Sequence, residues 1–197
     1  MAAQGDRRTA ILRCSADLFA RQGVAATTVR QIADEVGMLS GSLYHHFPSK
    51  DAIVNEVVTG YLDLLLSRYR EVTAVDRPPR ERLEALITAS LLVAESEPSA
   101  THIYQHEMSY IRELPRYEAV KAAAAEVQQT WLAVIEDGRA DGSFRDDIDP
   151  RVFYRFIRDA VWLSVRWYRP EGPHTVEQLA ADCASIFLDG YAAFDPD

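Results

Sequence analysis

The sequence predicts an all-α protein of nine helices without a strand. Apolar residues recur at intervals of three and four through the long segments, as they do between Ile53 and Tyr69. Capping residues and prolines divide the chain into pieces of ordinary helix length, for example at Asp149 and Pro150. No segment alternates apolar and polar residues in the manner of a strand. A chain of 197 residues is also long enough to build a core without disulfides.

The segment Thr27–Lys50 predicts two short helices joined by a tight turn. Thr28 begins a Thr-x-x-Gln capping box for the first helix, and Gly37 is suited to end it. A second helix is expected from Ser40 to Phe47, before a proline. A small residue at the crossing, a glycine near the turn and a short second helix are typical of a helix-turn-helix. An ordinary αα-hairpin fits the same pattern.

The remaining helices follow from their periodicity and from the residues that interrupt it. An amphipathic helix ending at Gly23 precedes the helix-turn-helix segment, and Ser49 is placed to cap a long helix after it. A capping box at Thr175 opens the last helix. These other helices are expected at residues 7–22, 49–73, 80–97, 99–114, 116–136, 149–169 and 175–191.

The charge is divided unevenly along the chain. Residues 1–50 carry six Lys/Arg and four Asp/Glu, for a net +2, whereas residues 51–197 carry fifteen and twenty-six, for a net −11. A mildly basic module attached to an acidic body fits a nucleic-acid-binding unit joined to a regulatory part. We therefore predict a nucleic-acid-binding module at residues 1–50 and an acidic regulatory body at residues 51–197.

Several classes of function are not expected. The sequence has no GxSxG, Walker-type, GxGxxG or HExxH motif, so neither an enzyme nor a bound cofactor is predicted. Its two cysteines lie far apart, and no apolar run is long enough for a signal peptide or membrane span. We expect a soluble, cytoplasmic protein. His102, His106 and Glu107 share one helical region, but a fourth zinc ligand is missing, so no metal site is predicted.

An arginine-rich stripe runs along the helix expected at residues 149–169. Arginines and one tryptophan recur there at steps of three and four, while the other positions are mostly apolar or aromatic. A helix this apolar is expected to be buried or in an interface, and desolvated guanidinium groups need anionic partners. Those partners are either structural carboxylates or an anionic ligand lying beside the indole. The stripe comprises Arg151, Arg155, Arg158, Trp162, Arg166 and Arg169.

The residues of the helix-turn-helix segment also carry a family resemblance. Gly41–Phe47 (GSLYHHF), followed by Ser49 and Lys50, resembles the signature of the TetR family of bacterial transcriptional regulators, and Thr27–Ala33 is similar to the segment upstream of it. The resemblance implies a TetR-like nine-helix architecture, with a helix-turn-helix DNA-binding domain at residues 1–50 and a ligand-binding and dimerisation domain at residues 51–197. It also implies a homodimer and a palindromic DNA operator. Leu39 departs from it, because the family usually has Ser or Thr as the cap at that position.

The resemblance also suggests which residues touch DNA. Phosphate contacts that set the register are expected from Thr28, Arg30, Tyr44, His45 and Lys50. Ser40 and Ser42 are expected to approach base edges, although Leu39 leaves open which of the two does so.

A second resemblance concerns the effector. Tyr154–Pro173, together with Leu39–Phe47, is similar to the KstR-type repressors of cholesterol catabolism in actinobacteria, in particular to the repressor of the late, ring-degrading genes. That subgroup implies release from DNA by a coenzyme A thioester of a partly degraded sterol, contacted here by Arg158, Trp162 and Arg166. Other readings stay open: a TetR-type regulator of another ligand, such as a fatty acyl-CoA, a metal or a hydrophobic cation, or a helical ligand-binding protein that does not bind DNA.

Overall fold

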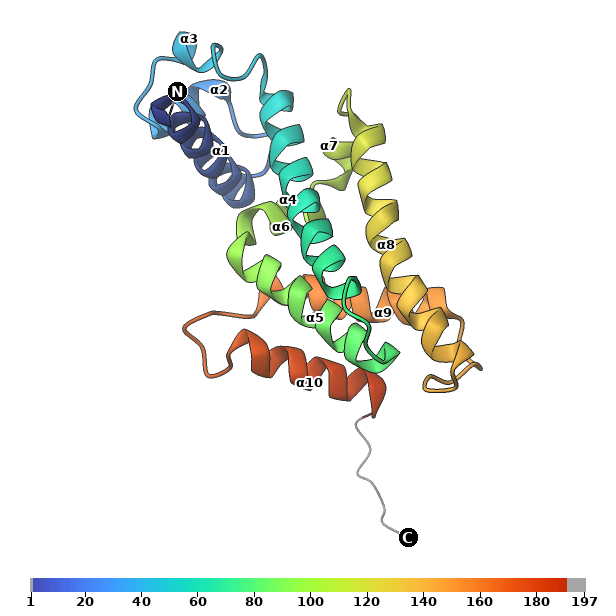
Figure 1. The fold of residues 1–197 in the computed structure, drawn as a ribbon. Coiled ribbons are helices and arrows are strands. Elements are labelled where there is room, and N and C mark those ends of the chain that lie inside the picture. The colour runs from blue at the N-terminus through green and yellow to red at the C-terminus, as the bar shows by residue number, and fades with distance from the viewer. Residues whose placement is uncertain (1, 191–197) are drawn as a thin grey trace. The chain divides into compact units, whose positions relative to one another are not determined.

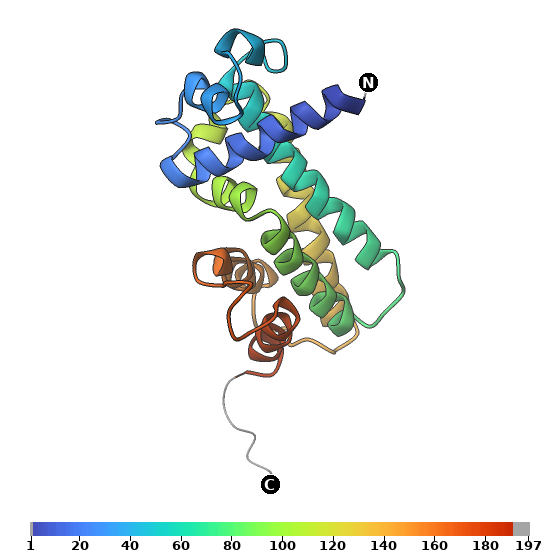
Figure 2. The same ribbon diagram turned by 90° about the vertical axis from the view of Figure 1, so that its left-hand side faces the viewer.

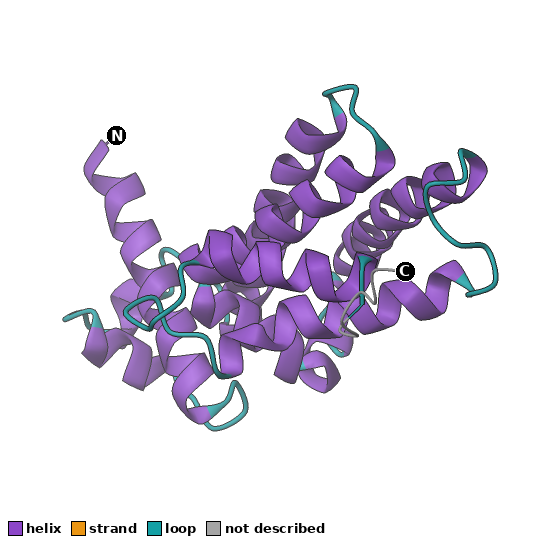
Figure 3. Ribbon diagram, turned by 90° about the horizontal axis from the view of Figure 1, so that it is seen from below, coloured by secondary structure: helices purple, strands orange, loops and turns teal. Residues whose placement is uncertain are grey.

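The computed structural model describes residues 2–190. Within that range all regular secondary structure is helical, and loops without a strand connect the helices (Figure 3). The described residues form ten α-helices and one short 3₁₀ helix, η1. The all-α prediction is therefore confirmed, and the extra helix comes from one unexpected break at Glu107. None of the described helices is long and apolar enough to cross a membrane.

The chain divides into two compact units, whose α-helices are labelled in Figure 1. The first comprises the described residues up to Leu64 together with Glu97–Ala124, and the second comprises Leu65–Ser96 together with the described residues from Ala125 onward. Both units therefore take residues from α4 and from α8. The helices are α1 (Ala2–Gln22), α2 (Val29–Glu35), α3 (Ser40–Leu43), α4 (Lys50–Thr73), α5 (Pro79–Ser96), α6 (Pro98–His106), α7 (Met108–Arg112), α8 (Tyr117–Ala140), α9 (Pro150–Trp162), η1 (Leu163–Arg166) and α10 (Val176–Leu188).

In the first unit, α1 packs against α2 and α6, and α2 packs against α3 (Figure 2). The predicted capping box begins α2: Gln31 N donates to Thr28 Oγ1 at 3.2 Å, and Thr28 N donates to Gln31 Oε1 at 2.8 Å. Gly37 follows with φ +65°, a conformation that glycine adopts without strain. Ile32 and Ala33 are fully buried, which makes the α2 crossing the centre of a small three-helix core.

The helix at Ser40 is shorter than predicted. It makes one regular turn, Ser40–Leu43, and the chain continues to Phe47 through hydrogen-bonded turns, with Phe47 N donating to Leu43 O at 3.0 Å. Leu39 occupies the N-cap and is 80% exposed, and no side chain caps this helix end. This helix therefore begins with a weak cap. An apolar side chain cannot accept the free backbone N–H groups of the first turn.

In the second unit, α5 packs against α9 and α10. The predicted caps of the last two helices are present, because Asp149 accepts from Arg151 N at 2.7 Å and Thr175 forms a capping box with Gln178. Helix α8 extends to Ala140, beyond its predicted end at residue 136. Gly138 therefore lies within it, and the ring of Phe144 fills the space that a Cβ at this position would need.

The helix expected at residues 149–169 ends early. Its α-helical part stops at Trp162, and Leu163–Arg166 form the tighter η1. The sequence predicts one α-helix that carries Arg158, Trp162 and Arg166. In the structure Arg166 lies on η1 instead, so its spacing from the other two is not that of an α-helix.

Candidate DNA-binding and effector sites

Most of the residues expected to touch DNA lie on the outer surface of α2, α3 and the turn after α3. Thr28, Arg30, Tyr44 and His45 are exposed, and Ser40 and Ser42 are half-buried on α3. The guanidinium of Arg30 is only loosely held by Asp34, at 3.8 Å, with its side chain 86% exposed. These side chains offer one cation, four hydroxyls and one imidazole to a phosphate backbone, which is the chemistry that non-specific DNA contacts require.

Lys50 is used differently from the sequence-based expectation. Its ammonium donates to Val24 O at 2.7 Å and to Thr27 O at 2.9 Å, with a longer contact to Ala25 O at 3.5 Å. It also lies 5.6 Å from the ring centroid of Tyr110. With its donors directed to the backbone of the α1–α2 loop, Lys50 holds this loop in place, and its contact with a phosphate stays a prediction.

The arginines of the predicted stripe are mostly exposed in the single chain, so they are not buried within it, and their burial in an interface stays a prediction. Arg151, Arg155, Arg166 and Arg169 are all exposed, and Arg158 is half-buried. Helix α9 buries only one narrow face, which consists of Tyr154, Ile157, Val161 and Trp162. The reason is that the helix lies at the surface of its unit, where it leaves its other face open.

Arg158 and Trp162 of the predicted effector set are anchored in the unit. Arg158 pairs with its neighbour Asp159 at 2.6 Å, and its guanidinium lies 5.8 Å from the ring centroid of Tyr154. Trp162 is 5% exposed. Arg166 is exposed on η1, one turn further along the chain. An anion reaching all three would therefore meet one half-exposed cation, one exposed cation and an indole that is part of the core.

A buried polar cluster adjoins Trp162 and was not predicted from the sequence. The hydroxyl of Tyr69 (α4) lies 2.6 Å from Ser90 Oγ (α5) and accepts a hydrogen bond from Trp131 Nε1 (α8) at 2.9 Å. Burial raises the pKa of Tyr69 to about 12, against which the nearby Ser90, Trp131 and Trp162 act more weakly. Trp162 thus lies near this hydroxyl of α4, the helix that begins at Lys50.

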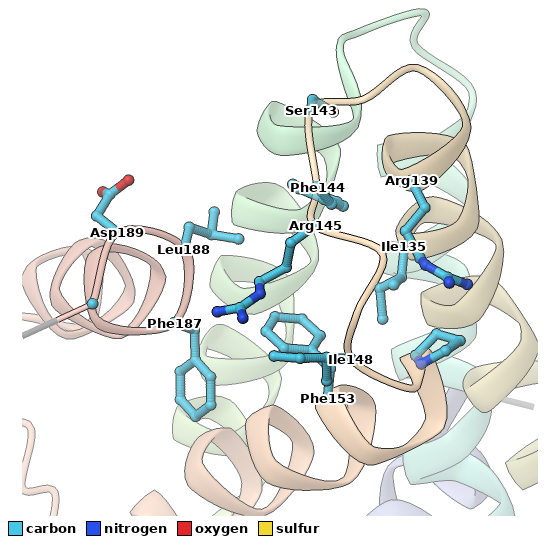
Figure 4. Close-up of a pocket in the computed structure, with 12 residues that line it drawn as sticks. Ile135, Arg139, Ser143, Phe144, Arg145, Ile148, Phe153, Phe187, Leu188 and Asp189 are labelled. Carbon is cyan, nitrogen blue, oxygen red and sulfur yellow. The ribbon is translucent and has the colours of Figure 1, made fainter.

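The second unit also contains a cavity of about 350 Å³ between the end of α8, the loop 141–149, the start of α9 and the end of α10 (Figure 4). Its walls are largely apolar and aromatic, and two arginines line it. Arg139 is paired with Glu136 at 2.8 Å, and Arg145 is paired with Asp147. None of the predicted effector residues lines this cavity. The apolar part of the lining comprises Ile135, Phe144, Ile148, Phe153, Phe187 and Leu188.

The two histidines of α6 do not form a metal centre with Glu107. The imidazole rings of His102 and His106 stack with centroids 4.2 Å apart, whereas the carboxylate of Glu107 accepts a hydrogen bond from Val24 N. Across the described residues, no group of three His, Cys, Asp or Glu side chains could hold a metal ion.

Comparison with known proteins identifies the family. The family described as "Bacterial regulatory proteins, tetR family" matches residues 11–57, which include α2 and α3. The family described as "Tetracyclin repressor-like, C-terminal domain" matches residues 76–191. The chain belongs to the TetR family of transcriptional regulators. The first match covers the surface built by α2 and α3, and the second covers the effector set on α9 and η1.

Among TetR-family proteins, the chain is similar to repressors named KstR2. It is 46% identical over 187 residues to HTH-type transcriptional repressor KstR2 of Rhodococcus jostii, covering 95% of this chain and 92% of that one. The structure of the ketosteroid transcriptional regulator KstR2 of Mycobacterium tuberculosis superposes with a TM-score of 0.88 at 43% identity, covering 93% and 94% of the two chains. A structure of AibR with isovaleryl coenzyme A and operator DNA shares the fold, with a TM-score of 0.82 at 23% identity over 94% and 100% of the two chains.

These findings make the protein a TetR-family transcriptional repressor like KstR2 and not an enzyme. The resemblance drawn from the sequence is thereby confirmed.

Proposed function

We propose that this repressor binds a palindromic operator as a homodimer and is released by a small anionic effector, a coenzyme A thioester of a sterol-ring catabolite. The similarity to KstR2 repressors over nearly the whole chain supports the comparison with a ketosteroid-responsive regulator. A protein of the same fold has been solved with both an acyl-CoA and operator DNA, which supports the pairing of these two ligands in one architecture.

The observation that carries the effector proposal is the composition of one short stretch of chain. Arg158, Trp162 and Arg166 lie within nine residues on α9 and η1, and they offer two guanidinium groups separated by an indole. Phosphates and a thioester carbonyl suit the arginines, whereas fused rings suit the aromatic and apolar surface. Because Trp162 also lies beside the Tyr69 cluster, a ligand that displaces its indole would alter contacts of α4.

The proposed dimer would use the outer faces of α9 and α10. Val152 and Phe156 on α9 are 43% and 68% exposed, and Ile186 on α10 is 51% exposed. Large apolar side chains gathered on neighbouring helices are typical of a protein–protein interface. In a homodimer, residues 51–197 would supply both this interface and the effector site, while residues 1–50 of each subunit would contact one operator half-site. Half-sites about 34 Å apart would then form an inverted repeat.

The decisive test is operator binding titrated with defined ligands. Wild-type protein on operator DNA is titrated with a steroid-ring acyl-CoA, isovaleryl-CoA, free CoA and the free acid, and release is followed by fluorescence anisotropy. Release by the steroid-ring thioester at the lowest concentration is expected. Release by isovaleryl-CoA at a lower concentration would assign a short-chain acyl-CoA effector instead.

The residues are tested with Arg158→Met and Arg166→Met, with the exposed Arg155→Met as the matched control on the same helix. Each charge-assisted contact contributes roughly 1.5–3 kcal/mol, so loss of one arginine should raise the effector concentration for release about tenfold to a hundredfold. Operator affinity without effector should not change. Variants that bind DNA normally and respond at the wild-type concentration would contradict the assignment.

A further inference from the structure

Helix α3 is too short to hold its own position. It makes a single turn, Ser40–Leu43, with Gly41 inside it and no side chain capping its start. Glycine is among the poorest helix formers, and one isolated turn has too few hydrogen bonds to offset the entropy lost in forming it. The placement of α3 must therefore come from contacts made by the chain on either side of it.

The turn before α3 is bound by the first part of α1, in the same compact unit. Arg7 donates from Nη2 to Val36 O at 3.1 Å. Val36 is the C-cap of α2, and Gly37 follows it in the turn that leads to α3. A guanidinium at a helix C-terminus satisfies a carbonyl that the helix leaves open, and its charge complements the helix dipole. Arg7 thus fixes the end of α2 from the side of α1.

The segment after α3 is held by the neighbouring arginine. The guanidinium of Arg8 lies over the ring of Phe47, with its Cζ 4.4 Å from the ring centroid. The same guanidinium forms a two-pronged ion pair with Glu56 of α4, in which Nη2 donates to Oε2 at 2.6 Å and Nη1 donates to Oε1. Phe47 is 1% exposed, and its N–H donates to the carbonyl of Leu43, the last residue of α3. Arg8 therefore joins α1, the end of the α3 segment and α4 through one planar group.

This arrangement depends on the shape of the guanidinium. One of its faces can stack on an aromatic ring while its edge donates two parallel hydrogen bonds to a carboxylate. The side chains of Arg8 and Glu56 are 43% and 34% exposed, and an ion pair at such a site adds little to stability. A DNA-binding surface, however, needs its side chains held within about 0.5 Å by the residues that support them. The pair is therefore expected to matter more for recognition than for folding.

We infer that Arg8 is a positioning residue for operator recognition, which acts through Phe47 and Glu56 to hold α3 against the bases and does not itself bind DNA. The inference rests on the operator binding of the proposed function. A phosphate contact is the other role open to an arginine in a basic module, and the two roles differ in sign at Glu56. If Arg8 binds a phosphate, removing the competing carboxylate strengthens DNA binding, whereas a positioning role needs that carboxylate and its removal weakens operator binding.

The test is a double-mutant cycle on the full-length protein, with Arg8→Met, Glu56→Met and the double variant. Methionine keeps much of each aliphatic stem and removes the charged group. Arg13→Met on α1 and Asp63→Met on α4 are the matched controls for the change of charge, because both residues are exposed on the same two helices. Each protein is measured for melting temperature and, well below it, for affinity across salt concentrations. The two probes are a duplex that the wild type selects from a randomised pool and a random duplex of the same length.

Arg8→Met should bind the selected duplex about tenfold more weakly, which is within the effect of one mismatched base pair. Its affinity for the random duplex and its salt slope should stay close to those of wild type, because no phosphate contact is lost. Glu56→Met should weaken binding to the selected duplex about threefold, since the contact between Arg8 and the Phe47 ring remains. The double variant should match Arg8→Met rather than the product of the two single effects, and both controls should keep the wild-type preference.

Tighter binding of the selected duplex by Glu56→Met, or a salt slope lower by about 0.9 in Arg8→Met, would overturn the inference and assign Arg8 to a phosphate. An Arg8→Met variant with a lower melting temperature and the wild-type preference between the duplexes would overturn it too, because Arg8 would then serve stability alone. A wild type that prefers no duplex over random DNA would overturn the proposed operator binding and this inference with it. A selective wild type and an equally selective Arg8→Met would overturn the positioning role only.

Discussion

The position of Lys50 separates a structural role from a DNA-contact role, and the two predict opposite results. Replacing Lys50 with Met keeps most of the aliphatic stem and removes the ammonium that binds Val24 O and Thr27 O. Hydrogen bonds from a charged donor contribute roughly 1.5–3 kcal/mol each. Because the site is half-buried, the lower end of that range applies, and we expect Lys50→Met to reduce the free energy of unfolding by about 2–4 kcal/mol.

The assay has two readouts on the same protein. For a chain of this size, about 1 kcal/mol corresponds to roughly 2–4 °C, so the melting temperature of Lys50→Met should fall by about 4–16 °C. Operator affinity is then measured across salt concentrations, well below the melting temperature. A residue that neutralises one phosphate contributes about 0.9 to the slope of log affinity against log salt. Lys50→Met should keep the wild-type slope, because its ammonium serves the α1–α2 loop.

Arg30→Ala is the matched control within the same unit. The Arg30 side chain is 86% exposed and has only a loose ion pair with Asp34, so its loss should leave the melting temperature unchanged. If Arg30 contacts a phosphate, the salt slope should fall by about 0.9. The reasoning for Lys50 would be refuted by a variant that melts at the wild-type temperature and loses about one unit of salt slope.

Two further predictions concern the second unit. Tyr69→Phe should lower the free energy of unfolding by about 1–3 kcal/mol, since the buried Trp131 N–H loses its acceptor. A decrease of less than about 0.5 kcal/mol would show that the cluster does not stabilise the core. Burial raises the pKa of Tyr69 to about 12, whereas the same group ionises near pH 10 in the unfolded chain. The contribution of Tyr69 to the free energy of unfolding is therefore complete below about pH 10 and decreases between about pH 10 and 12. This decrease should be smaller in Tyr69→Phe. Phe156→Glu, which places a charge on an exposed apolar face, should shift sedimentation from dimer to monomer; a stable dimer in Phe156→Glu would remove α9 from the interface.

The ends of several elements could be predicted because their causes are local. Thr28 and Thr175 each have a glutamine three residues later, and Asp149 precedes a proline. Each helix cap therefore joins residues that are close in the sequence. Such contacts form in any context that permits a helix, so a sequence pattern is sufficient to place them. The helix-turn-helix motif and its family resemblance are of the same kind, since they depend on a short continuous segment.

The sequence by itself thus determined the helical class, most helix starts and the family, whereas the tertiary structure decided how individual polar side chains are used. Lys50 carries the positive charge expected of a phosphate contact, but its ammonium binds carbonyl oxygens that lie more than twenty residues earlier in the chain. Glu107 favours a helix locally, yet it lies between α6 and α7, where its carboxylate accepts a hydrogen bond from Val24 N, 83 residues away. From the sequence Tyr69 is an ordinary core aromatic, whereas in the structure its hydroxyl contacts Ser90 Oγ and Trp131 Nε1. A hydrogen bond between distant segments contributes a few kilocalories per mole, which outweighs a helix propensity of less than about 1 kcal/mol per residue. No local sequence pattern indicates which distant group will lie nearby.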